Sequence, residues 1–114
     1  MSAVYVNNLT INAGADFNET FTFESSPSGS PLNLTNYTVA SNMRKWYGSQ
    51  TSIPFVTRIE YPPTSGRVTI FLPGEDSQNI KPGRYVYDVL LTDSFGIKTR
   101  VVEGSILVRE GVTR

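Results

Sequence analysis

The sequence contains no cysteine and no histidine among its 114 residues. Without cysteine the chain forms no disulfide and offers no thiolate nucleophile. Without histidine it lacks the usual general base near neutral pH and the commonest metal ligand in proteins. These two absences exclude a disulfide scaffold, zinc sites of the cysteine–histidine type and serine–histidine or cysteine–histidine catalysis.

Charge is also scarce, and the two signs are balanced. Ten basic and ten acidic residues cancel, and charged residues make up 18% of the chain, below the roughly 25% of an average soluble domain. Proteins that bind nucleic acid or anionic membranes carry an excess of lysine and arginine. We therefore expect neither nucleic acid nor a membrane as a partner.

Long apolar runs are missing as well. No segment approaches the roughly 20 apolar residues of a membrane-spanning helix, and residues 1–5 lack the basic start and apolar run of a signal peptide. We expect synthesis in a host cytoplasm and a soluble product. The length is near the commonest domain size, so residues 1–114 are expected to form a single domain.

Sequence motifs that carry catalysis are not present. The carboxylates closest in sequence are the neighbours Glu75 and Asp76 and the pair Asp16 and Glu19, but spacing alone does not place two carboxylates across a sugar. Acidic residues also favour the start of a helix, which is our interpretation of Glu75 and Asp76. Serine-x-x-lysine and phosphate-binding glycine patterns do not occur. The sequence therefore predicts no enzyme, no cofactor and no metal.

Apolar and polar residues alternate with a period of two through most of the chain, as is typical of strands with one buried face. The expected strands cover residues 3–11, 16–24, 37–44, 53–60, 67–72, 85–91 and 97–109. A helix fits only at 73–80, for about two turns at most. This pattern predicts an all-β fold, an antiparallel immunoglobulin-like β-sandwich of about seven strands, with a closed barrel as the alternative.

Four residues give finer expectations. Tyr85 follows a tight proline–glycine turn, which predicts a tyrosine corner with the hydroxyl bonded to the backbone a few residues upstream. Pro54 predicts an edge strand or a bulge. Glu19 would face the core, so we expect it near a strand end or a bulge. Gly104 interrupts the last strand, which we expect to bend there or to cross between sheets.

The tetrapeptide 44–47 combines two cations with two aromatic rings. Four interpretations stay open: a clamp for single-stranded nucleic acid, a sugar-stacking platform, an anchor in a protein interface, or Trp46 covering the core at a strand end. The C-terminal segment 108–114 leaves the apolar pattern, so we expect it to be frayed in isolation and to contact a partner. Two interpretations stay open for the N-terminal end: residues 1–6 add as a strand to a neighbouring sheet, or residues 4–11 only complete their own sheet. The candidate partner contacts are Arg44, Trp46, Tyr47, Arg109, Val112 and Arg114.

Several phrases occur together in this sequence: residues 11–17 (INAGADF), 32–37 (LNLTNY), 43–45 (MRK), 82–89 (PGRYVYDV), 100–104 (RVVEG) and 111–114 (GVTR). Over most of the chain they resemble small structural proteins of tailed bacteriophages, especially those infecting cyanobacteria. They are also similar to the N-terminal domains of phage baseplate upper proteins and tail fibres. This resemblance implies a docking module without catalytic residues. Fibre-type relatives continue into a long trimeric shaft, whereas this sequence stops at Arg114.

The expectation from residues and resemblance is a non-enzymatic virion structural protein. It would bind other phage structural proteins on the capsid or tail, in several copies, as a decoration, cement or fibre-adaptor protein. The alternative is a glycan-binding host-attachment module that stacks sugars on Trp46, Tyr47, Tyr61 or Tyr5. A cluster of these rings on one exposed face would favour that alternative, and their burial would exclude it. An enzyme, the third hypothesis, has no histidine or cysteine to use.

Overall fold

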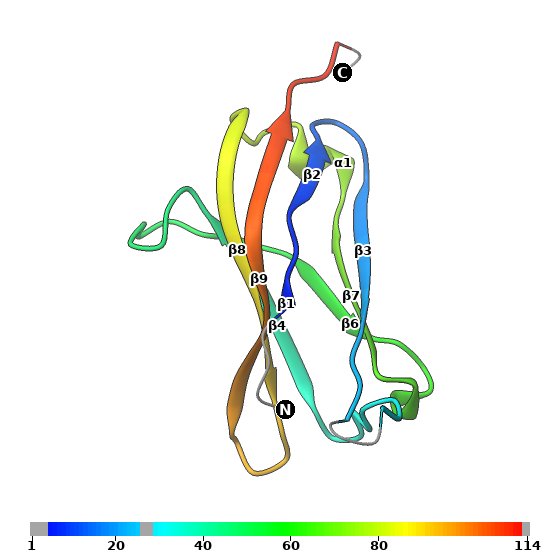
Figure 1. The fold of residues 1–114 in the computed structure, drawn as a ribbon. Coiled ribbons are helices and arrows are strands. Elements are labelled where there is room, and N and C mark those ends of the chain that lie inside the picture. Colours follow the sequence, from blue (N-terminus) through cyan, green and yellow to red (C-terminus); the bar gives the residue numbers. More distant parts are fainter. Residues whose placement is uncertain (1–4, 26–28, 113–114) are drawn as a thin grey trace.

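The computed structural model describes residues 5–25 and 29–112, which form an all-β sandwich of two sheets packed face to face (Figure 1). The larger sheet contains, in spatial order, β1 (Tyr5–Val6) and β2 (Leu9–Asn12) along one edge, then β9 (Lys98–Arg109), β8 (Gly83–Thr92), β4 (Thr38–Arg44) and β5 (Ile53–Pro54). The smaller sheet contains β3 (Phe17–Thr22), β7 (Arg67–Leu72) and β6 (Val56–Ile59). The connections hold a 3-10 turn, η1 (Pro63–Ser65), and one short helix, α1 (Gly74–Ser77). The predicted all-β sandwich is confirmed.

Two of the predicted strands are each divided, so the described residues form nine strands rather than about seven. Segment 3–11, of which residues 3 and 4 lie outside the described residues, becomes β1 and β2 on the same edge. Segment 53–60 becomes β5 in the larger sheet and β6 in the smaller one. The chain changes sheets at Phe55, whose buried ring lies 5.8 Å from the ring of Phe17. Pro54 lies on an edge strand, as predicted, because it has no N–H to give to a further neighbour.

The antiparallel prediction is wrong at one edge of the larger sheet, where β1 and β2 pair with β9 in parallel. After β2 the chain turns at Gly14, whose φ is 89°, and continues as β3 in the other sheet (Figure 1). Strand β2 therefore has no hairpin partner in its own sheet. Strand β9 enters from its hairpin with β8 and runs in the same direction as β2. The more specific immunoglobulin-like topology stays a prediction.

The core lies between the two sheets and is built from the inward-facing residues of both. The fully buried side chains include Ile11, Phe23, Met43, Val68, Ile70, Val89 and Ile106. Glu19 departs from this apolar pattern in the middle of β3, opposite Ile70 in an unbroken ladder, so the predicted strand end or bulge is wrong. The half-burial of this carboxylate is compatible with folding because β3 is an edge strand.

The irregularity in strand β9 does not lie at Gly104. Its register against β8 shifts between Val89 and Leu90, which leaves Val101 as the extra residue of a β-bulge. Gly104 is instead required by a close approach, because a Cβ atom there would lie 2.1 Å from the carbonyl oxygen of Asn7. The prediction of a bend or sheet crossing at this glycine is wrong, since β9 stays within the larger sheet on both sides of it.

The same Asn7 carbonyl oxygen accepts a hydrogen bond from the Tyr87 hydroxyl at 2.7 Å. Burial raises the pKa of Tyr87, and the nearby carboxylate of Glu19 raises it further. The phenol therefore remains a hydrogen-bond donor throughout the neutral range and ties the junction of β1 and β2 to β8.

Tyr85 occupies the predicted corner position at the start of β8. Its ring is 8% exposed, and its hydroxyl donates a hydrogen bond of 2.7 Å to the carbonyl oxygen of Lys81, four residues upstream. Burial raises the pKa of this hydroxyl. The predicted bond from Tyr85 to the backbone is confirmed.

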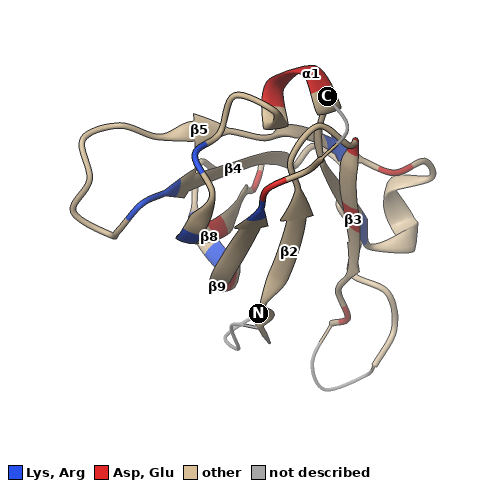
Figure 2. Ribbon diagram, turned by 90° about the horizontal axis from the view of Figure 1, so that it is seen from above, with Lys and Arg blue, Asp and Glu red and all other residues tan. Residues whose placement is uncertain are grey.

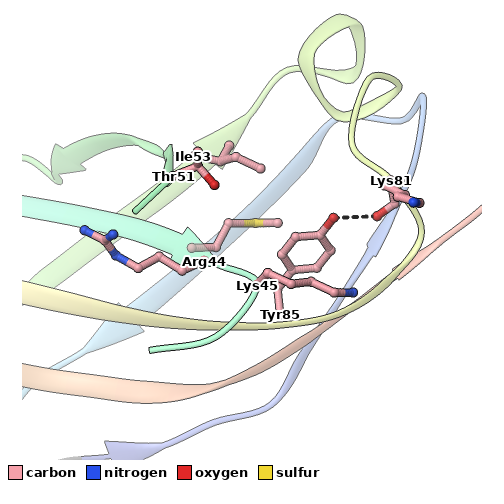
Figure 3. Close-up of a pocket in the computed structure, with 7 residues that line it drawn as sticks. Arg44, Lys45, Thr51, Ile53, Lys81 and Tyr85 are labelled. Atoms are coloured by element: carbon pink, nitrogen blue, oxygen red, sulfur yellow. Dashed lines mark hydrogen bonds between the residues drawn. The ribbon is translucent and has the colours of Figure 1, made fainter. Parts of the chain in front are cut away.

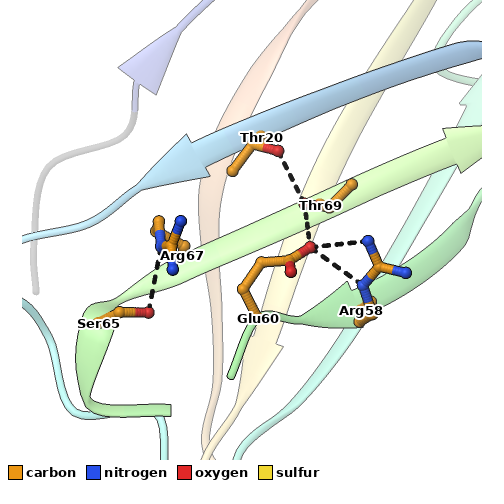
Figure 4. Close-up of polar contacts among 6 residues, drawn as sticks. All are labelled: Thr20, Arg58, Glu60, Ser65, Arg67 and Thr69. Atoms are coloured by element: carbon orange, nitrogen blue, oxygen red, sulfur yellow. Dashed lines mark hydrogen bonds and ion pairs between the residues drawn. The ribbon is translucent and has the colours of Figure 1, made fainter. Parts of the chain in front are cut away.

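A polar row crosses the smaller sheet (Figure 4). The hydroxyls of Thr20 and Thr69 lie 2.8 Å apart, and Thr69 donates to a carboxylate oxygen of Glu60 at 2.6 Å. Arg58 forms an ion pair with the same carboxylate at 3.0 Å. Two hydrogen bonds lower the pKa of Glu60, and the one from Thr69 has a larger effect than the one from Arg58.

Replacing Tyr85 by Phe removes one hydrogen bond from the corner and leaves the Lys81 carbonyl without this donor. We expect the free energy of unfolding to fall by about 1 kcal/mol. Urea denaturation followed by far-UV circular dichroism measures this change. An unchanged midpoint would contradict a structural role for the bond.

A Gly104→Ala substitution forces a methyl group against the Asn7 carbonyl. Overpacking of this kind costs about 1–3 kcal/mol, and we expect a loss of stability in that range. Gly48→Ala is the matched control, because the nearest atom to its added Cβ would be 3.6 Å away, an ordinary contact. Equal unfolding midpoints for the two variants would refute the close-approach explanation.

The lowered pKa of Glu60 gives stability a definite pH dependence. Its folded-state pKa lies below the ordinary value of 4.5, so its ionised form stabilises the fold above that pH. This contribution is lost as the pH falls through the folded-state pKa. Glu60→Gln should therefore lose less stability than wild type between about pH 5 and pH 3. Urea denaturation across this range tests it, with Glu75→Gln as control; parallel curves for all three proteins would contradict it.

Candidate protein-interaction site

The tetrapeptide noted in the sequence opens the β4–β5 loop, residues 45–52, which projects from the side of the sandwich (Figure 1). Trp46 is 61% exposed and Tyr47 is 75% exposed. The interpretation in which Trp46 covers the core is therefore wrong. The reason is that the chain leaves the sheet directly after Arg44, so the two rings follow the loop outward instead of the strand.

Hydrogen bonds within the β4–β5 loop fix its shape. The N–H of Ser49 donates to the Trp46 carbonyl at 3.0 Å, and the guanidinium of Arg44 donates to the Ser49 carbonyl. The buried Ser49 hydroxyl donates to the carbonyl of Thr51 at 3.1 Å. The indole of Trp46 lies beside Gly48, where an added Cβ would be 3.6 Å from the ring. The loop thus presents its two aromatic rings from a braced turn.

A pocket of about 380 Å³ lies between the base of this loop and the tyrosine corner (Figure 3). Its apolar lining comes from Met43, Ile53 and Tyr85, and its cationic lining includes Lys45 and Lys81. The Lys45 ammonium lies 4.8 Å from the centre of the Tyr85 ring, a cation–π contact. We call this feature the corner pocket. No acidic residue lines it among the described residues.

A second hollow, of about 530 Å³, lies on the outer face of the larger sheet, on the opposite side of β4. Arg44 and Tyr47 line it, together with Arg100 from β9. Arg100 forms an ion pair with Asp88 at 3.2 Å and approaches Glu103 at 3.8 Å. The positive charge that β9 contributes to this hollow is therefore already neutralised.

The predicted C-terminal contacts lie apart from the loop. Arg109 is exposed at the end of β9, on the same end of the larger sheet as Arg44, because β4 and β9 end there and β8 begins there. Val112 is 99% exposed beyond the sheet, and Arg114 lies outside the described residues. Val108, by contrast, is buried and paired with Gly83, so the core pattern continues further than predicted.

The four aromatic residues proposed as sugar platforms do not form one cluster. Tyr61 is 88% exposed, but its turn lies near the beginning of β4, where the N–H of Leu34 donates to the Pro63 carbonyl at 3.0 Å. Trp46 follows the other end of that strand. The side chain of Tyr5 lies outside the described residues. Only Trp46 and Tyr47 remain as neighbouring exposed rings of this set.

The carboxylates singled out in the sequence, Asp16, Glu19, Glu75 and Asp76, line neither hollow. Glu75 and Asp76 are exposed in the first turn of α1, which agrees with their interpretation as a helix start. Asp16 accepts a hydrogen bond from the Gly74 N–H at 2.7 Å. Residues 5–25 and 29–112 contain no group of three histidine, cysteine, aspartate or glutamate side chains placed to hold a metal ion. No helix in the same ranges is long and apolar enough to span a membrane.

Local sequence patterns do not show that Lys45, Lys81 and Tyr85 form one site. A signal for part of it was present, since a tyrosine corner places residue 81 next to Tyr85. Alternation along β4 also places Lys45 on the same side as the buried Met43. The remaining information, that β4 lies beside β8 with Arg44 opposite Val86, comes only from the strand pairing.

No protein-family model matches the chain, and no curated protein does either. Among solved structures it is similar to an internalin-like protein of Listeria monocytogenes, with a TM-score of 0.43 and 16% identity over 95% of this chain and 28% of that one. It is also similar to a family 123 glycoside hydrolase from Clostridium perfringens, with a TM-score of 0.44 and 16% identity over 98% of this chain and 24% of that one. The chain spans about a quarter of the length of these two proteins, and likenesses at this level carry no conclusion about its function.

Proposed function

We propose that this domain is a non-enzymatic structural protein of a bacteriophage particle, which docks on the capsid or tail surface through its β4–β5 loop. The observation that carries the proposal is the exposure of Trp46 and Tyr47, at 61% and 75%, on a loop held by its own hydrogen bonds. Tryptophan, tyrosine and arginine are the residues most often found as binding hot spots in protein interfaces.

The braced shape of the loop supports binding rather than simple exposure. An interface pays for the ordering of the side chains and loops that it immobilises. The bonds from Ser49 to Trp46 and from Arg44 to Ser49 exist before any partner arrives, so little further ordering of the backbone is needed. Exposed apolar rings on such a loop lose contact with water only when a partner covers them.

The assignment to a phage particle rests on the sequence resemblance to phage structural proteins, which spans most of the chain. The composition agrees with it, since a chain without cysteine has no thiol to oxidise outside the cell. The role within this proposal is that of a decoration, cement or fibre-adaptor protein, present in several copies and bound to other structural proteins of the particle.

A glycan-binding attachment module is the second candidate, because Trp46 and Tyr47 are neighbouring exposed rings on which a sugar could stack. Tyr61 lies near the opposite end of β4, so this platform consists of two rings. The two candidates differ in their ligand, a protein surface in the first and a sugar in the second, so the binding experiment below separates them.

The Trp46→Ala/Tyr47→Ala double variant tests the docking role. Neither ring belongs to the core, so the thermal unfolding midpoint should stay within about 2 °C of wild type. Truncating interface hot spots costs about 2 kcal/mol or more, which corresponds to at least about 30-fold weaker binding. The measurement is co-sedimentation of purified protein with phage particles assembled without it.

Tyr61→Ala is the matched control, since it removes an equally exposed ring from a different place. It should bind particles as wild type does. Equal binding by the double variant and the control would refute docking through the loop. Unchanged particle binding combined with lost retention on immobilised host-surface glycans would replace the proposal with the glycan-binding alternative.

A further inference from the structure

Positive charge collects at the end of the larger sheet where β4 and β9 end and β8 begins. Figure 2 looks onto this end and shows basic segments at the ends of β4 and β9 and near the start of β8. One acidic segment directly follows β9, and the acidic segment of α1 lies apart from the basic ones. The cationic residues concerned are Arg44, Lys45, Lys81, Arg84 and Arg109. The chain has no net charge, so this positive character is local.

Lys45 and Lys81 in the corner pocket are not neutralised by any carboxylate of the described residues. The ion pairs of the described residues involve Arg58 and Arg100, each with neighbouring carboxylates elsewhere on the sandwich. Neither lysine forms an ion pair within residues 5–25 and 29–112. Two unneutralised ammonium groups on a partly apolar pocket create a positive local potential that attracts an anionic group.

The tyrosine corner fixes where these two charges lie. The ring of Tyr85 carries the Lys45 ammonium at 4.8 Å on its face, and its hydroxyl holds the Lys81 backbone at 2.7 Å. Figure 3 shows Lys45 and Lys81 on the same side of the Tyr85 ring, with Arg44 extending in the opposite direction. The lysine pair therefore acts on one side of the ring, next to the thioether of Met43 and the side chain of Ile53.

We propose that the corner pocket receives an acidic segment of a partner protein, with an aspartate or glutamate between Lys45 and Lys81 and an adjacent apolar side chain against the half-buried Ile53. This deepens the proposed docking function and rests on it. The occupant follows from charge complementarity and from the mixed lining. A volume of about 380 Å³ is of the size that holds one or two side chains. In this arrangement the carboxylate neutralises the two lysines, and the neighbouring apolar side chain covers the apolar lining of the pocket.

The experiment is a titration of the isotope-labelled full chain with the blocked tetrapeptide acetyl-Leu-Glu-Asp-Phe-amide, followed by NMR. The matched probe is the same peptide with glutamine and asparagine in place of the acids. We expect shift changes centred on the amides of Lys45, Lys81 and Tyr85, and binding at least about tenfold weaker for the neutral peptide. Added salt should weaken the acidic peptide selectively, because exposed charges are screened.

Charge reversal locates the site. Lys45→Glu/Lys81→Glu should lose binding of the acidic peptide by at least about tenfold. The control Arg67→Glu/Lys98→Glu makes the same charge change on exposed residues elsewhere and should bind it as wild type does. A Lys45→Gln/Lys81→Gln variant covers the case in which the reversed pair disturbs folding, and it should also lose binding.

Three results would overturn the proposal: equal binding of the two peptides, equal loss in the pocket and control variants, or shift changes outside the corner pocket. Inorganic phosphate producing the same shifts at the same concentration would also overturn it, by showing a general anion site. Failure here is separable from failure of the docking proposal. The particle-binding test removes the rings of Trp46 and Tyr47, and this titration leaves them in place.

Discussion

The hydrogen bond from Tyr85 to the Lys81 carbonyl brings together three features at one corner of the molecule: the core, a turn and a surface cation. The ring belongs to the core, the carbonyl belongs to the turn that leads from α1 into β8, and the face of the ring carries the ammonium of Lys45. A domain without disulfides must hold such turns by packing and hydrogen bonds alone. The position of the two pocket lysines is therefore a consequence of how the core is closed at this corner.

The sandwich admits polar side chains inside only where each finds a partner or an edge. The buried Ser41 hydroxyl donates to the Asp88 carbonyl at 2.6 Å, and the buried Thr69 hydroxyl lies between Thr20 and Glu60. Within the described residues no buried side-chain nitrogen or oxygen lacks a hydrogen bond. Glu19, by contrast, lies on the edge strand β3, where its side chain is only half-buried. Polar groups thus restrict strand register without leaving unsatisfied charges or donors.

Local pattern was sufficient to predict the elements but not their neighbours. Strands β3, β4, β7, β8 and β9 follow from alternation, and the Tyr85 corner follows from a tight turn before a tyrosine. The change of sheet at Phe55 and the parallel pairing of β2 with β9 depend on which strands meet, which a period-two pattern does not encode. The role of Gly104 was missed for the same reason, since its neighbour Asn7 is remote in sequence. The tetrapeptide 44–47 was singled out from the sequence with its exposure left open, and the pocket beside it was not found, because the pocket joins residues 43–53 to residues 81–85.

Alternation along β4 also separates the two features proposed for binding. Arg44 borders both hollows, but Tyr47 lines only the one on the outer face, whereas Met43 and Lys45 line only the corner pocket on the other side of the strand. Strand β5, which follows the loop, is the edge of the larger sheet. A partner that covers the aromatic rings and also places a carboxylate in the pocket must therefore extend around the β4–β5 edge rather than lie flat on one face. A segment wrapped in this way makes two linked contacts, one on each side of β4, so that the release of one contact leaves the other to hold the segment nearby.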